Sequence, residues 1–137
     1  MLKAFRQLTL ILVLTTSAIF MVGCGRQEFE TSSVLVVLTR EATLLQRDFT
    51  PDDFPEVNIE YVEDLTAYSW KIFIQVINGE IPAEETLVNI DTFRRMLLLR
   101  LESSGRRNVL RAVDSLGSNA HVHIAEANYY LDIGWGN

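Results

Sequence analysis

Residues 8–22 read LTLILVLTTSAIFMV, fifteen uncharged and mostly apolar residues, and they decide how much of the chain is left to fold. Lys3 and Arg6 precede this run, and Gly23 follows it. A basic start, an apolar segment of this length and a small residue at its end are typical of a secretory signal. The run is short for a membrane-spanning helix, which needs about 20 apolar residues. We therefore expect residues 1–23 to form a signal-peptide helix that takes no part in the mature fold.

The only cysteine of the chain, Cys24, follows this segment directly. The stretch Met21-Val22-Gly23-Cys24 resembles the bacterial lipobox, in which Leu, a small or apolar residue, and Gly or Ala precede a cysteine. Met21 in the first position departs from that pattern. The resemblance implies that Cys24 carries diacylglycerol and becomes the first mature residue, so that buried acyl chains hold an extracytoplasmic protein at the bacterial cell membrane. The alternative is an uncleaved anchor helix with an incidental cysteine.

Removal of 23 residues from 137 leaves 114, the size of one ordinary domain. We expect a lipidated tether over residues 24–33, one domain over 34–130 and a C-terminal tail over 131–137. From Gly23 onward the chain holds ten basic and eighteen acidic residues. This balance argues against a nucleic-acid or anionic-membrane surface, since either needs clustered Lys and Arg.

The charges are also unevenly placed along the chain. Residues 41–91 hold twelve acids and two basic residues, whereas residues 92–117 hold six basic residues and two acids. One interpretation is that the two segments lie side by side and attract each other. The other is an acidic patch that recruits a basic partner.

Hydrophobic periodicity predicts four strands and one clear amphipathic helix. The strands are expected at residues 33–39, 57–63, 93–102 and 119–126. Residues 103–117 begin with serines suited to capping and form a helix whose apolar face holds Val109, Ala112, Val113 and Leu116. In the second strand, Val57, Ile59 and Tyr61 are expected on one face.

Two connecting segments are less clear. Residues 67–78 fit both a helix and a strand, and we favour a helix that ends at Asn78-Gly79. A short helix is expected near residues 41–47, and an acidic loop or short helix over 80–91. Taken together, the order of elements predicts an α+β fold with a ferredoxin-like antiparallel sheet and two helices on one face.

Two stretches resemble the propeptide domains of subtilisin-like proteases, and more closely the fervidolysin-type N-terminal prodomain. They are VLVVLT at residues 34–39 and the unit from LLLRLESSGRRNVL to HVHIAEANYY at residues 97–130. In that family the last strand closes on a motif such as Ala-Glu-Pro-Asn-Tyr. Here residues 125–129 read AEANY, so that Ala127 stands in place of the proline.

This resemblance implies a mechanism. A prodomain packs its sheet against two helices of its protease, and its C-terminal tail lies in the substrate cleft as an added strand. The partner-binding tail would then consist of Ala127, Asn128, Tyr129, Tyr130, Leu131, Asp132 and Ile133. We expect a lipoprotein that binds, and under one interpretation inhibits, a subtilisin-like protease. The alternatives are a non-inhibitory interaction module of the cell surface and a remnant of a longer secreted protein.

No motif for a nucleophile, a phosphate loop or a metal cluster is recognised, so neither an enzyme nor a cofactor is expected. His121 and His123 would supply two zinc ligands, but no third is evident, and an exposed strand face is the simpler interpretation. Five acidic residues would suit calcium but lack the EF-hand pattern, so we interpret them as solvated carboxylates. They are Asp52, Asp53, Glu56, Glu63 and Asp64.

Overall fold

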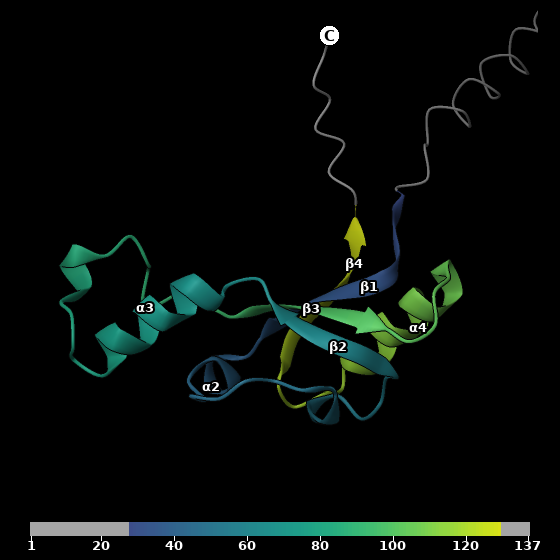
Figure 1. Ribbon diagram of the computed structural model, residues 1–137, viewed down its shortest axis with the longest axis horizontal. Helices are drawn as coiled ribbons and strands as arrows, with labels where there is room; N and C mark the ends of the chain where they lie inside the picture. Colours follow the sequence, from purple (N-terminus) through teal and green to yellow (C-terminus); the bar gives the residue numbers. More distant parts are fainter. Residues whose placement is uncertain (1–27, 130–137) are drawn as a thin grey trace, which may run out of the picture.

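A computed structural model describes residues 28–129 of the chain. The predicted signal peptide, Cys24 and residues 130–137 lie outside this part. The described chain is an α+β domain with a four-stranded antiparallel sheet and three α-helices (Figure 1). The strands are β1 (Phe29–Leu38), β2 (Ile59–Asp64), β3 (Met96–Leu101) and β4 (Val122–Tyr129), and the helices are α2 (Arg40–Thr43), α3 (Ala67–Ile77) and α4 (Arg106–Leu116). Short 3₁₀ turns, η1 and η2, lie at Pro51–Asp53 and Ala83–Glu85.

The strands lie in the order β2-β3-β1-β4, and every neighbouring pair is antiparallel. β1 is central and pairs with β3 and β4, whereas β2 and β4 form the two edges. Because β3 and β4 both run against β1, they are parallel to each other, as a strand-helix-strand unit joined by α4 requires. The four expected strands and the helix expected at 103–117 are therefore confirmed, although their bounds differ by a few residues from those predicted.

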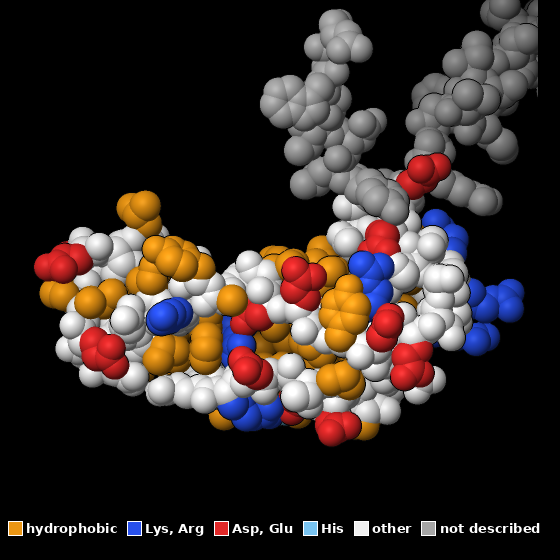
Figure 2. Space-filling model, in the orientation of Figure 1, with side chains coloured by type: hydrophobic (Ala, Val, Ile, Leu, Met, Phe, Trp, Pro, Cys, Tyr) orange, Lys and Arg blue, Asp and Glu red, His pale blue; other side chains and the backbone are white. Residues whose placement is uncertain are grey.

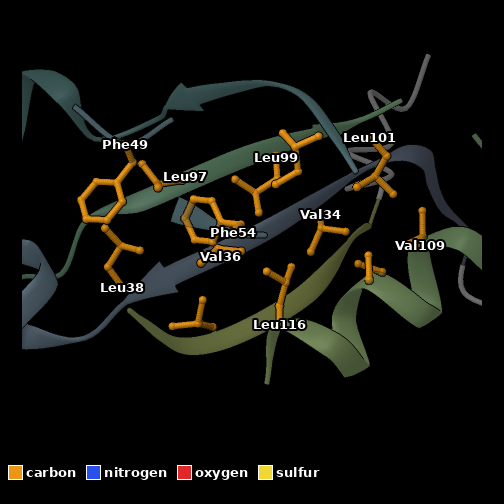
Figure 3. Packing of buried hydrophobic residues seen from close by; sticks show 14 of the residues in the cluster. Val34, Val36, Leu38, Phe49, Phe54, Leu97, Leu99, Leu101, Val109 and Leu116 are labelled. Carbon is orange, nitrogen blue, oxygen red and sulfur yellow. The ribbon is translucent and has the colours of Figure 1, made fainter. Parts of the chain in front are cut away.

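One face of the sheet carries the hydrophobic core. Val34, Val36 and Leu38 of β1 are fully buried there, next to Leu97 and Leu99 of β3. α4 covers one half of this face with Val109, Ala112 and Leu116, which confirms its predicted apolar side. Figure 3 shows Phe49 and Phe54 over the other half, above Leu97, Leu99 and Val36. Both phenylalanines come from the irregular segment between α2 and β2, so this segment replaces a second covering helix.

The prediction of two helices on one face is therefore only half right. α3 forms as predicted, but it lies beyond the end of the sheet, on an arm that joins β2 to β3 (Figure 1). Its one fully buried side chain, Phe73, packs on Phe93 with ring centroids 5.0 Å apart, outside the main core. The helix thus has a small apolar cluster of its own.

Three local expectations are wrong for identifiable reasons. β1 begins at Phe29, so half of the predicted tether 24–33 is strand. A register shift between Ile59 and Tyr61 turns Tyr61 to the face opposite Ile59, and Val62 takes the inner position opposite Leu99. Gly105, with φ 124° and ψ 143°, occupies the N-cap position before α4, and no serine side chain caps the helix. That backbone conformation is open mainly to glycine, so the chain turns there without a capping side chain.

Candidate protein-interaction surface

The second face of the sheet, which we call the open sheet face, presents an apolar row across β3, β1 and β4. Val37 of β1 lies between Met96 of β3 and Ile124 of β4. Leu65, just after β2, extends the row because its N–H donates to the carbonyl of Met96. Leu65, Ile124 and Met96 are 47%, 43% and 36% exposed. Large apolar side chains aligned in this way mark an interaction surface more often than scattered ones do.

The next row is apolar in the middle and acidic at the edges. Leu35 pairs with Leu98 at the centre, while Glu63 on β2 and Glu126 on β4 lie outside them. Leu35 and Leu98 are only partly buried, and both glutamates are exposed. The open sheet face therefore has an apolar centre with charged edges, the arrangement found in protein interfaces.

The third row closes the face with a polar network around Glu30 and Arg100. Arg100 donates to the Glu30 carboxylate at 2.8 Å and to the Tyr61 hydroxyl at 3.3 Å. Ser32 and Ser33 also donate to Glu30, and Asn128 donates to Ser33 at 3.2 Å. This network ties the start of β1 to the ends of β3 and β4.

The network changes the acidity of Glu30. Burial opposes its ionisation, but the Ser32 and Ser33 hydrogen bonds and the Arg100 charge outweigh burial, so the pKa of Glu30 lies below its ordinary value of 4.5. Glu30 is thus held as a carboxylate and paired with Arg100. The polar groups at this end of the face already bond to one another. The apolar rows are therefore the part of the face that is suited to a partner.

The arm that carries α3 is fixed to the sheet by a buried arginine. Arg95, 1% exposed, donates from Nε and Nη2 to Asp64 Oδ2 at 2.9 and 2.6 Å. Its third side-chain bond goes to the Arg47 carbonyl at 2.8 Å. Its guanidinium lies 3.9 Å from the ring centroid of Trp70, and the Trp70 indole donates to the Thr43 carbonyl at 2.8 Å. The arm therefore leaves the sheet from a rigid base.

Beyond this base the arm exposes apolar side chains. Tyr68 is 79% exposed, and Leu87 is as exposed as in an extended chain. In Figure 2 hydrophobic side chains gather over α3 and the loop after it, at the left of the view. The arm is a second apolar surface.

The predicted tail begins inside the sheet. Ala127, Asn128 and Tyr129 are the last residues of β4. Ala127 is buried opposite Val34, and the Tyr129 ring packs edge-on against Phe29 at 5.6 Å. Tyr130, Leu131, Asp132 and Ile133 lie outside the described residues, as does Cys24. The binding role of the tail stays a prediction.

The structure does not bring together the histidines and acidic residues considered as metal ligands, and two of the acidic residues form ion pairs with arginines. The His121 ring packs edge-on against Phe49 at 5.5 Å, and His123 is exposed. Asp53 accepts from Arg47 at 2.7 Å, and Asp64 is held by Arg95. Within residues 28–129 no three His, Cys, Asp or Glu side chains come together as a metal site would require.

The two charged segments meet at one ion pair. Asp64, from the acidic segment, holds Arg95 from the basic segment, whereas Arg47–Asp53 is formed inside the acidic segment. Arg106, Arg107 and Arg111 of the basic segment lie on α4 and form no ion pair with any described residue. Most of the basic charge therefore remains on the surface.

The resemblance implied that a sheet face binds a partner, but the sequence analysis did not identify the residues of the open sheet face. Its signal was present, because VLVVL in β1 and MLLL in β3 are apolar at every position rather than at alternate ones. In an antiparallel sheet, an unbroken apolar run places apolar side chains on both faces.

No protein family model, no curated protein and no solved structure matches the chain. Among the helices of residues 28–129, none is long and apolar enough to cross a membrane.

Proposed function

We propose that the chain is an extracytoplasmic lipoprotein, anchored to a bacterial membrane through Cys24, that acts by binding another protein rather than as an enzyme. One observation carries the proposal: the apolar row of Leu65, Met96, Val37 and Ile124 on the open sheet face. A sheet face of this kind in a domain of about 100 residues is best stabilised when a partner covers it.

The partner we propose is a subtilisin-like protease. The resemblance to prodomains of that family implies a sheet whose free face packs against two protease helices. The strand order β2-β3-β1-β4 and the α4 connection between β3 and β4 agree with the ferredoxin-like arrangement of such domains. The departure is the α3 arm, together with the irregular segment that covers the core in place of a second helix.

The proposed tail follows from the position of β4. β4 is an edge strand that ends at Tyr129, the last described residue, so the proposed tail would start from the edge of the sheet. An extended segment of this kind binds by strand addition, in which backbone hydrogen bonds supply affinity and alternate side chains fill pockets. Because Ala127 is buried, recognition by side chains would begin after it.

The test uses residues 24–137 and measures inhibition of subtilisin with a chromogenic peptide. We expect the chain to inhibit, and we expect Ile124→Glu to weaken inhibition on the order of 30-fold, the effect of losing about 2 kcal/mol at one apolar contact of the row. Leu110→Glu is the matched control, because Leu110 on α4 is 46% exposed and Ile124 is 43% exposed.

A chain that ends at Tyr129 keeps β4 whole and removes only residues 130–137, the part of the proposed tail beyond the strand and the residues after it. It should still bind subtilisin but no longer block its cleft. The inhibitor proposal is lost if the full chain neither slows cleavage nor survives digestion. The tail mechanism alone is lost if both chains inhibit equally.

The α3 arm favours a second candidate function, a non-inhibitory interaction module of the cell surface. A plain prodomain would not need this arm, yet a buried arginine fixes it and it exposes Tyr68 and Leu87. Under this proposal, Leu87→Glu would weaken binding to the natural partner while inhibition of subtilisin would be absent from the start.

A further inference from the structure

We propose that the outer face of α4 rests on the anionic headgroups of the membrane to which the protein is anchored. This inference rests on the proposed lipid anchor at Cys24. Besides the lipid anchor, the domain would then have a second, electrostatic contact with the membrane. This contact would fix the orientation of the domain relative to the membrane. The acidic composition of the whole chain argues against such a contact, but the fold gathers basic side chains locally.

The outer face of α4 is a basic patch with an apolar centre. Leu110, 46% exposed, has Arg106 and Arg107 one turn before it and Arg111 beside it. These side chains and Asp114 line one shallow depression on the helix. The Asp114 carboxylate offsets one arginine, so the face keeps a net positive charge. Figure 2 shows basic side chains, in blue, projecting at the right of the view, where α4 lies.

The patch lies next to the segment that leads to the anchor. The Gly105 N–H, at the start of α4, donates to the Thr31 carbonyl of β1 at 2.7 Å. The Arg106 guanidinium lies 4.7 Å from the ring centroid of Phe29. Cys24 precedes Phe29 by five residues, which span at most about 17 Å when extended. An acylated Cys24 would therefore keep the first turn of α4 close to the headgroups.

The chemistry of the patch suits that surface. The apolar face of α4 is buried against the sheet, so the contact would rest mainly on arginines that pair with lipid phosphates, with the partly exposed Leu110 at the interface. Each basic residue near an anionic leaflet contributes a factor on the order of five in affinity. The tether raises the local concentration of the patch, so three arginines suffice for a contact that an untethered acidic domain would not make.

This contact leaves the open sheet face accessible. α4 covers the core face of the sheet, so its outer side and the open sheet face point in opposite directions. A domain that rests on α4 would present Val37, Met96 and Ile124 away from the membrane. The same fold then separates the surface for the membrane from the surface for a partner.

The test couples residues 24–137 through the Cys24 thiol to a maleimide lipid in vesicles. One set of vesicles is phosphatidylcholine alone, and the other contains about a quarter phosphatidylglycerol. The rate of phenylglyoxal modification is then measured for each arginine by peptide mass. We expect Arg106, Arg107 and Arg111 to react on the order of fivefold more slowly on the anionic vesicles at low salt, and we expect high salt to abolish the difference. Arg47 and Arg94 should react equally on both vesicles.

Matched variants with equal loss of charge give the control. Arg107→Gln/Arg111→Gln should release Arg106 from protection, whereas Lys71→Gln/Arg94→Gln should not. Equal rates for the three α4 arginines on both vesicles would overturn the proposal. So would protection that appears only in intact cells, because it would indicate an acidic protein partner. Chemical coupling makes this test independent of the anchor, which is checked separately by the mass of the protein from cell membranes.

Discussion

The ion pair between Arg95 and Asp64 should respond unequally to the loss of each partner. The Arg95 side chain is 2% exposed and that of Asp64 is 18% exposed. Asp64→Asn therefore leaves a buried guanidinium without its countercharge, which costs about 3–5 kcal/mol in comparable sites. Arg95→Met removes the buried charge and leaves a carboxylate that reaches water and still accepts from Thr66 at 2.9 Å.

The expected cost of Arg95→Met is smaller, about 2–3 kcal/mol. It comprises the charge-assisted bonds to Asp64, the bond to the Arg47 carbonyl and the stacking on Trp70, less the regained hydration of Asp64. The free energy of unfolding of the double variant should be close to that of Arg95→Met alone. Once Arg95 is gone, Asp64→Asn no longer breaks an ion pair and costs little more.

Urea unfolding followed by far-UV circular dichroism measures all three free energies of unfolding. The reasoning is refuted if Asp64→Asn costs less than Arg95→Met. It is also refuted if the two single costs simply add in the double variant, since partners in direct contact should be coupled.

Three further predictions concern the core, a backbone turn and acid stability. Phe54→Ala should lower the free energy of unfolding by about 3–5 kcal/mol in urea titrations, because Phe54 is fully buried over the sheet, and a loss under 1 kcal/mol would contradict that packing. Gly105→Ala should cost about 1–3 kcal/mol in the same assay, because φ is 124° there, and an unchanged midpoint would mean that the turn adopts another conformation. Glu30→Gln should lower stability at pH 7 by about 1–2 kcal/mol. Because the pKa of Glu30 is lowered on folding, its contribution to stability is present above the ordinary value of 4.5 and disappears as pH falls through the folded pKa. The melting temperatures of Glu30→Gln and the unaltered protein should therefore differ at neutral pH and approach each other in acid.

The elements that the sequence predicts well are those with a regular apolar pattern. The face of α4 follows from the spacing of Val109, Ala112 and Leu116, and all three are buried against the sheet. β3 follows in the same way from Leu97, Leu99 and Leu101. Local periodicity identifies such elements because one neighbouring surface buries them.

The parts that were missed depend on contacts between distant segments. No pattern in residues 67–77 shows that α3 lies beyond the sheet, since its position is fixed by Arg95 reaching Asp64 and Trp70. The face of Tyr61 depends on a bulge in the pairing of β2 with β3, which β2 alone does not encode. The excess of basic residues over 92–117 is visible in the sequence, but the exposure of Arg106, Arg107 and Arg111 depends on how α4 packs against the sheet.

The central claim is that the open sheet face binds the protease. It is tested most directly by calorimetric titration of residues 24–137 into subtilisin whose catalytic serine has been sulfonylated, which limits the contribution of the tail. Met96→Glu places a charge in the middle of the apolar row, and Leu110→Glu places one on the opposite side of the domain. The account predicts a Kd weakened on the order of 30-fold by Met96→Glu and unchanged by Leu110→Glu. Equal affinity of both variants and the unaltered chain would contradict it.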